Sequence, residues 1–204
     1  MKLFYAPGTV SIAVVIALHE AGIAFETHKV SFKDAEQTKP AYHKVNPKGR
    51  VPALEVDGVI LTETGAILDY IAAVTPDAGL MPDVPIDAAR VRGVIHYLAS
   101  TMQVNHAHGP RASRWATEAS SHADMRAQVQ TNMTASATFI EEHCLTGPFV
   151  MGEHVTVADA HLFVMCLWLK GDGVDVSAFP RITTFLKAME ARPSVQAVRA
   201  AGML

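Results

Sequence analysis

The spacing of apolar residues changes near residue 80, and no other feature of the chain constrains its fold as strongly. Before this point, short apolar stretches typical of strands alternate with helical patterns. After it, apolar residues recur at the spacing of helices, and no segment favours a strand. The boundary is the stretch PDAGLMPDVP, residues 76–85, where prolines and a glycine interrupt regular structure. We therefore expect two domains, residues 1–76 and 86–204, joined by a linker at residues 77–85.

The first of these parts predicts strands and helices in a β-α-β-α-β-β-α order. Alternating or continuous apolar stretches favour the strands, and the dipeptide Asp57-Gly58 is a strong hairpin signal between the last two. Gly22 marks the end of the first helix. The expected elements are a strand at 2–6, a helix at 11–21, a strand at 24–32, a helix at 34–44, two strands within 51–63, and a helix at 64–74.

The second part predicts an all-α domain. Helical patterns cover residues 86–106, 121–143, 155–170, 179–191 and 194–200. Within the third of them, Thr156 precedes Asp159 by three residues, which is the spacing of a capping box. We therefore interpret Asp159 as a helix cap, and a role as a catalytic acid is the weaker alternative.

Composition excludes several classes of function. Half of the 204 residues are apolar, 18% are charged, and the formal charge is -3, so nothing predicts binding to nucleic acid or to an anionic membrane. No secretion signal and no run of about 18 apolar residues occurs, which favours a cytoplasmic protein. Cys144 and Cys166 have no CxxC partner, so we expect neither a disulfide framework nor a metal site, and interpret both as small core residues, with a reactive thiol as the alternative.

The turn APGTVSIA, residues 6–13, connects the first strand to the first helix. Free N–H groups at a helix start attract anions, so Thr9 and Ser11 are candidates for binding a negatively charged atom. The alternative is an ordinary cap, in which one hydroxyl only closes the first helical turn. The turn alone does not decide between the two.

Four motifs in order resemble those of a cytosolic-type glutathione transferase: YAPGTVS, NPKGRVPAL, LTETGAIL and TVADAHLF. The resemblance covers essentially the whole chain and is greatest to the bacterial beta class, whose opening YxxPGxCS pattern is nearly reproduced. It implies a thioredoxin-like domain followed by an all-helical one, glutathione as co-substrate without a metal, a homodimer, and a role in detoxification.

The resemblance also implies how glutathione binds. It predicts a cis peptide bond between Val51 and Pro52, with the Val51 backbone pairing with the cysteinyl backbone of glutathione. Glu63 would accept from the γ-glutamyl ammonium, and Thr64 would hold the α-carboxylate at a helix start. From the residues alone, a trans bond and a plain helix cap are the alternatives. Arg50 and, less strongly, Lys33 are candidates for the glycyl carboxylate.

The characteristic beta-class cysteine is replaced by Val10, which excludes cysteine-dependent chemistry at this position. The resemblance to hydroxyl-using transferases implies that Ser11, or secondly Thr9, donates a hydrogen bond to the glutathione sulfur. Tyr5 offers another hydroxyl, but its register favours packing.

The second substrate is expected against the helical domain, near Asn105, His106 and His108 as well as Val10. His106 matches a histidine of beta-class sequences, whereas Ala107 replaces the neighbouring lysine. The alternative for these histidines is an interaction with the helix C-terminus.

We expect the activity to be attack of the glutathione thiolate on a small hydrophobic electrophile. Two alternatives remain open: glutathione-dependent reduction of disulfides or peroxides, and non-catalytic binding of glutathione or apolar ligands.

Overall fold

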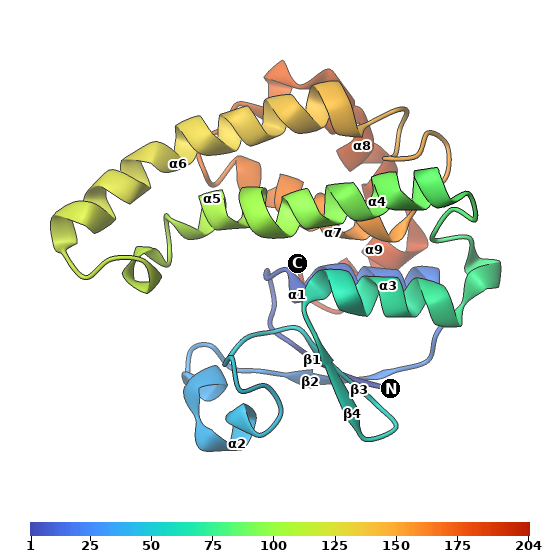
Figure 1. Cartoon of the computed structure of the whole chain (residues 1–204), viewed down its shortest axis with the longest axis horizontal. Helices are drawn as coiled ribbons and strands as arrows, with labels where there is room; N and C mark the ends of the chain where they lie inside the picture. The colour runs from blue at the N-terminus through green and yellow to red at the C-terminus, as the bar shows by residue number, and fades with distance from the viewer.

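A computed structural model describes all residues from 1 to 204 (Figure 1). Its first part contains a four-stranded sheet and three helices, which run in the predicted order. Their bounds are β1 Lys2–Tyr5, α1 Ser11–Glu20, β2 Glu26–Lys29, α2 Pro40–His43, β3 Ala53–Val56, β4 Val59–Thr62 and α3 Thr64–Val74. The strand order is β2-β1-β3-β4, in which β1 pairs parallel with β2 and antiparallel with β3, and β3 pairs antiparallel with β4. This is the predicted thioredoxin-like arrangement.

The second part is helical, so the predicted fold class is confirmed. The α-helices are α4 Pro85–Tyr97, α5 Gln103–Ala107, α6 Ala119–Phe139, α7 Val157–Leu169, α8 Pro180–Glu190 and α9 Pro193–Ala200. The helices predicted at 86–106 and 121–143 are present, but each contains a π-helical turn, at Leu98–Met102 and Ile140–Cys144. Such turns widen a helix locally and are frequent near functional sites.

The predicted helix at 34–44 is the least accurate of these expectations. The structure has a 3₁₀ turn at Glu36–Thr38 and a single helical turn, α2, that begins at Pro40. Proline has no N–H to donate and restricts the residue before it, so Pro40 separates the two turns. The connection between α3 and α4 is also partly ordered, because it contains a 3₁₀ turn at Pro76–Ala78.

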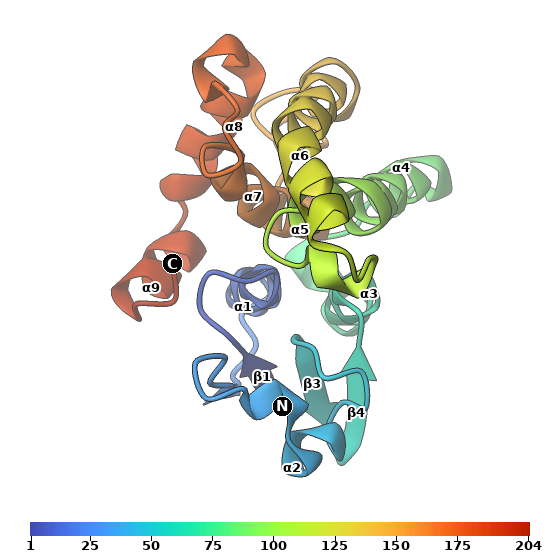
Figure 2. The ribbon, with the colours of Figure 1, turned by 90° about the vertical axis from the view of Figure 1, so that its left-hand side faces the viewer.

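Helix α1 lies between the sheet and the helical part (Figure 2). Its sequence SIAVVIAL is apolar on every side, and all of its residues from Ser11 to Leu18 are buried. It packs against α3, α7 and α9, so one hydrophobic core extends through both parts of the chain. Arg192 and Ser194 add polar contacts between α9 and Glu20 at the end of α1. Helix α1 is therefore held at the junction between the two parts of the chain. The division into two domains at residues 77–85 stays a prediction.

The capping box at the start of α7 is confirmed. One carboxylate oxygen of Asp159 accepts the Thr156 N–H at 2.6 Å and the Thr156 hydroxyl at 2.8 Å, and the other accepts the Val150 N–H at 2.7 Å. Burial raises the pKa of Asp159 to about 6, although these hydrogen bonds act in the opposite direction. The carboxylate lies in the interior of the helical part and holds two segments together, as the structural interpretation expects.

Both cysteines are buried and free, as expected for small core residues. Burial raises the pKa of the Cys144 thiol to about 11, and it raises that of Cys166 as well. None of the helices combines the length and apolar character needed to cross a membrane.

Candidate active site

Two adjoining cavities, of about 390 and 340 Å³, lie between the sheet domain and the helical part. They are called the interdomain cavity below, because residues from both parts of the chain line each of them. The residues that line both are Val10, Arg50, Val51, Gln103, Ala107, Arg111 and Arg114. A space of this size, with a few polar groups among apolar ones, is typical of a small-molecule site.

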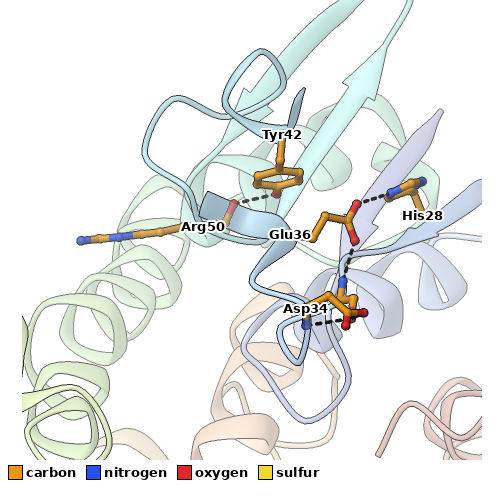
Figure 3. Close-up of polar contacts among 6 residues, drawn as sticks. His28, Asp34, Glu36, Tyr42 and Arg50 are labelled. Carbon is orange, nitrogen blue, oxygen red and sulfur yellow. Dashed lines mark hydrogen bonds and ion pairs between the residues drawn. The ribbon is translucent and has the colours of Figure 1, made fainter. Parts of the chain in front are cut away.

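On the sheet side, the wall is built around the cis Val51-Pro52 bond, which is confirmed. The Arg50 carbonyl accepts from the Tyr42 hydroxyl at 2.8 Å and from the Asn46 side chain at 2.7 Å, which fixes the chain just before Val51 (Figure 3). Neither the N–H nor the C=O of Val51 is bonded to another protein group. This backbone pair is therefore available to a ligand that binds as an extended strand.

The loop before Val51 is itself supported by a polar network. Glu36 accepts from the Ser31 N–H at 2.7 Å and pairs with His28 at 3.0 Å (Figure 3). Burial raises the pKa of Tyr42 to about 12, with a smaller effect from Glu36, so its hydroxyl keeps its proton and remains a donor. In the same view, the Arg50 side chain extends away from this network. Its guanidinium forms no ion pair or hydrogen bond within the protein.

Glu63 and Thr64 lie at the start of α3 and line the cavity together with Lys48. Glu63 adopts a φ of 71°, an uncommon left-handed value for a non-glycine residue, at the point where β4 turns into the helix. The Lys48 ammonium lies 2.5 Å from the Glu63 carboxylate and 2.8 Å from the Thr62 hydroxyl. No protein group bonds the Thr64 hydroxyl, so an anion, a cation and a free hydroxyl face one end of the cavity.

At the other end, the turn before α1 places Thr9 and Ser11 differently. Thr9 lines the cavity, whereas the Ser11 side chain is completely buried. The Ser11 hydroxyl accepts the Ala6 N–H at 3.1 Å, and it lies 3.2 Å from the Ala6 carbonyl and 2.7 Å from the Thr9 hydroxyl. It therefore closes the turn and does not reach the cavity, which corrects the preference for Ser11 over Thr9 as the group beside a ligand sulfur.

Val10 is the N-cap of α1, and its side chain does not cap the helix. Its N–H has no bond within the protein, and the residue lines both parts of the cavity. The unpaired N–H at a helix start and the Thr9 hydroxyl together provide donors for an anion.

Gly8, which precedes these donors, is fixed from the helical part. Its carbonyl accepts from the Trp168 indole at 3.2 Å, and its N–H donates to the Met203 carbonyl at 2.9 Å. Trp168 stacks on His106 with ring centroids 4.2 Å apart, and Asp172 bonds the His106 ring at 2.8 Å. Segments far apart in the sequence thus set the position of the turn.

The structure brings most of the predicted site residues together and leaves four outside. Thr9, Val10, Arg50, Val51, Pro52, Glu63, Thr64 and His106 line the interdomain cavity. Ser11, Lys33, Asn105 and His108 do not.

Lys33, Asn105 and His108 have other surroundings, and their predicted roles stay predictions. Asn105 donates to Ser136 at 3.1 Å and so contributes to the packing of α5 on α6. His108 contacts the Trp115 ring edge-on, with centroids 4.7 Å apart. Lys33 is exposed on the loop after β2. Asn105 and His108 are sequence neighbours of His106, but side chains of neighbouring residues on a helix point in different directions. Their spacing in the sequence therefore did not show which of the three lines the cavity.

Sequence reasoning missed several lining residues. Lys48 lies inside the motif NPKGR, but the hairpin that brings it to Glu63 is not visible in the motif. Gln37 has a buried side-chain oxygen that no protein group bonds, and it lines the cavity beside Arg50. Arg111 and Arg114 belong to a loop without any motif. No group of three or more His, Cys, Asp or Glu side chains is arranged to hold a metal ion.

Comparison with known proteins agrees with this geometry. The family model "Glutathione S-transferase, N-terminal domain" matches residues 1–73, and "Glutathione S-transferase, C-terminal domain" matches residues 111–201. The chain belongs to the glutathione S-transferase family. A solved glutathione transferase homologue from Sulfitobacter with bound glutathione is 55% identical, with a TM-score of 0.98 over 100% of this chain and 98% of its own.

Two further relatives of this transferase show the breadth of the family. A beta-class glutathione S-transferase from Sphingomonas chungbukensis is 33% identical, with a TM-score of 0.85 and complete coverage of both chains. A maleylacetoacetate isomerase from Rhizobium meliloti (strain 1021) is 30% identical over 179 residues, which is 86% of this chain and 84% of its own. The predicted resemblance to bacterial glutathione transferases is confirmed, whereas the substrate beyond glutathione differs among relatives.

Proposed function

We propose that this glutathione transferase conjugates the glutathione thiolate to small hydrophobic electrophiles. The observation that carries the proposal is the unpaired N–H and C=O of Val51, which lie between Glu63 and Thr64 on one side and the start of α1 on the other. Glutathione is a short extended peptide with charged ends and a central thiol. The order of charged end, backbone and thiol along glutathione matches the order of these protein groups along the cavity.

In the proposed complex, the cysteinyl backbone of glutathione pairs with Val51, just before the start of β3, through the two backbone hydrogen bonds of strand pairing. The γ-glutamyl ammonium binds Glu63, and its α-carboxylate binds Thr64 and Lys48, whose ammonium turns from Glu63 toward the new anion. The glycyl carboxylate binds Arg50. Lys33 has no part in this arrangement.

The glutathione sulfur is then placed at the start of α1, beside the Thr9 hydroxyl and the Val10 N–H. The Ser11 hydroxyl can donate to the Thr9 hydroxyl 2.7 Å away, and the Thr9 proton then turns from the Ala6 carbonyl to the sulfur. Ionising the thiol at pH 7 requires a decrease of about two pKa units, or roughly 2.7 kcal/mol. One hydrogen bond to a charged acceptor contributes about 1.5–3 kcal/mol, and the helix start adds up to about 1 kcal/mol.

The reaction needs no covalent intermediate with the protein. The thiol proton leaves to solvent, and a sulfur lone pair then forms the C–S bond to the electrophilic carbon. In a substitution the leaving group takes the electrons of the bond that breaks. In an addition to an enone the C=C π electrons move to the carbonyl oxygen, and the enolate then takes a proton from solvent. Apolar lining residues of the helical part, including Ile95, Ala99 and Val104, supply the surface for the second substrate.

Turnover across a panel of electrophiles tests this proposal against its alternatives. Conjugation of aryl halides, epoxides or enones is the expected result. Activity confined to hydroperoxides and disulfides would identify a glutathione-dependent reductase instead. Activity confined to cis-enone carboxylates, without net consumption of glutathione, would identify an isomerase like the Rhizobium relative. Tight glutathione binding without any turnover would identify a carrier.

A cytoplasmic homodimer is part of the same proposal. The end of α3, the connecting segment and the start of α4 lie at one end of the molecule (Figure 1), and Val74, Val84 and Ile86 in these segments are exposed. Exposed apolar side chains that cluster in this way favour an interface between two copies. Sedimentation of the wild type and of the Val84→Glu/Ile86→Glu variant tests it, because the variant should sediment as a monomer.

A further inference from the structure

Three arginines without a partner converge on the interdomain cavity. Arg50, Arg111 and Arg114 line both of its parts, and none of their guanidinium groups takes part in a hydrogen bond or an ion pair within the protein. Arg90, Arg92, Arg192 and Arg199 form ion pairs on the surface or between helices, and Arg181 donates to backbone carbonyls. Arg126 on α6 is likewise unpaired and exposed, so what distinguishes the other three is that they line one cavity.

Local structure explains how two of them come together. Arg111 precedes, and Arg114 ends, the 3₁₀ turn Ala112–Arg114 that follows α5. A 3₁₀ turn has three residues per turn, so residues three apart project from the same side. Both guanidinium groups thus approach the cavity from the helical part, opposite Arg50 on the sheet side.

The arrangement is electrostatically unfavourable in the absence of an anion. Arg111 is half-buried, and burial together with the charge of Arg50 lowers the pKa of its guanidinium. Burial and the charges of Arg111 and Arg50 do the same to Arg114. Like charges held together in a partly buried site repel each other, so a bound carboxylate relieves the repulsion.

Glutathione alone does not neutralise the cavity. Lys48 and the three arginines are its permanent cations, and Glu63 is the only carboxylate that lines it, which leaves three positive charges in excess. Glutathione with an ionised thiol carries two carboxylates, one thiolate and one ammonium, a net charge of two negative. One positive charge remains after it binds. With Arg50 assigned to the glycyl carboxylate, Arg111 and Arg114 have no anion to bind.

We infer that the second substrate carries a carboxylate, which Arg111 and Arg114 bind while its electrophilic carbon faces the glutathione sulfur near Val10. The inference rests on the proposed function, because it names the class of electrophile that the same site accepts. A guanidinium matches a carboxylate with two parallel hydrogen bonds, and the neighbouring Trp115 ring, 45% exposed, offers a flat apolar surface for the rest of the molecule.

A matched pair of unreactive ligands tests the binding step. Calorimetry with glutathione-saturated protein compares 3,5-dinitrobenzoate with its methyl ester, which lacks only the charge. We expect Arg114→Gln and Arg111→Gln to weaken binding of the acid about 10- to 100-fold and to leave the ester nearly unchanged. Arg111→Lys should fall between, because it keeps the charge but loses the forked geometry. The control is Arg90→Gln, which removes one charge from the exposed face of α4.

A reactive pair tests the same contact during turnover. In 4-chloro-3,5-dinitrobenzoate and its methyl ester, the thiolate forms a C–S bond and chloride leaves with the electrons of the C–Cl bond. After correction for each uncatalysed rate, kcat/KM for the acid relative to the ester should fall about tenfold or more in Arg114→Gln and stay constant in Arg90→Gln.

Equal affinities for the acid in the wild type and in both glutamine variants would overturn the inference. So would binding of the acid only when glutathione is absent, since the arginines would then serve the peptide. If neither chlorinated compound is turned over, the proposed conjugation fails, and the calorimetric comparison still decides whether this is a carboxylate site.

Discussion

The hydroxyl groups of Thr9 and Ser11 lie 2.7 Å apart, yet only that of Thr9 reaches the interdomain cavity. Ser11 instead bonds both backbone groups of Ala6 and holds the turn in shape. Both hydroxyls contribute to the turn, because that of Thr9 also bonds the Ala6 carbonyl, at 2.8 Å, but only Thr9 lines the cavity as well.

We predict that Ser11→Ala destabilises the fold more than it changes the chemistry. The Ala6 N–H loses its acceptor inside the protein, which costs about 1–3 kcal/mol of unfolding free energy. Urea denaturation measures this loss, and the thiol pKa of bound glutathione should shift by less than about half a unit. An unchanged stability combined with a rise in thiol pKa of one unit or more would indicate that the Ser11 hydroxyl bonds the glutathione sulfur.

Trp168→Phe is predicted to loosen the turn before α1. Phenylalanine keeps an aromatic ring against His106 but removes the hydrogen bond to the Gly8 carbonyl. The loss should cost about 0.5–1.5 kcal/mol and increase local opening. Amide hydrogen exchange of residues 8–12 should therefore quicken, whereas Trp115→Phe, which changes the only other tryptophan, should leave it alone. Equal exchange in both variants would show that the indole does not restrain the turn.

His161 is expected to make the fold sensitive to acid. It is fully buried without a hydrogen-bond partner, and burial lowers its pKa to about 4. The folded protein keeps this ring neutral while the unfolded chain binds a proton below pH 6.5, so stability decreases as the pH falls from 6.5 to 4. Asp159 has the opposite effect: its pKa is raised to about 6 in the folded protein, so its protonation increases stability as the pH falls from 6 to 3.8.

The variant His161→Met isolates the contribution of the histidine, since Asp159 is common to both proteins. Relative to its value at pH 7.5, the stability of the variant should exceed that of the wild type by about 2–3 kcal/mol at pH 4.5. Parallel stability curves over this range would mean that His161 is protonated in the folded protein, with an acceptor that the structure does not contain.

How far the sequence alone predicts the site depends on how local each interaction is. The capping box of Thr156 and Asp159 lies within one motif and was predicted from its spacing. The cis Val51-Pro52 bond was predicted only from the family resemblance, because the residues alone leave a trans bond as the alternative. The bond from Trp168 to Gly8 joins residues 160 positions apart, and no pattern of spacing encodes it. Ser11 was misplaced because a turn of a few residues decides which hydroxyl faces inward, and this depends on the left-handed Gly8 and on packing against the C-terminus.

The arginines of the cavity illustrate the same limit. In the sequence, Arg111 and Arg114 look like ordinary charges of a surface loop. Only the structure shows that they line one cavity together with Arg50 from the other part of the chain. Helix and strand positions, by contrast, follow from apolar spacing that every segment carries by itself.

Val10→Cys should create a reactive thiol. The side chain lines the cavity at the N-cap of α1, where the helix start lowers the pKa of a cysteine. Incubation with oxidised glutathione should add one glutathionyl group to the variant and none to the wild type, as mass spectrometry records. The buried Cys144 and Cys166 serve as internal controls, because both are expected to stay unmodified in either protein. An unmodified variant would place the sulfur site away from this turn.

The central claim is that the start of α1 ionises glutathione through Thr9, and the pKa of the bound thiol tests it most directly. Titration of the thiolate absorbance at saturating glutathione should give a pKa about two units below that of the free thiol in the wild type. Thr9→Val should raise it by about one to two units, and Thr9→Ser, which keeps the hydroxyl, should leave it within about half a unit of the wild type. A bound thiol with the pKa of free glutathione, or equal values in Thr9→Val and the wild type, would contradict the account.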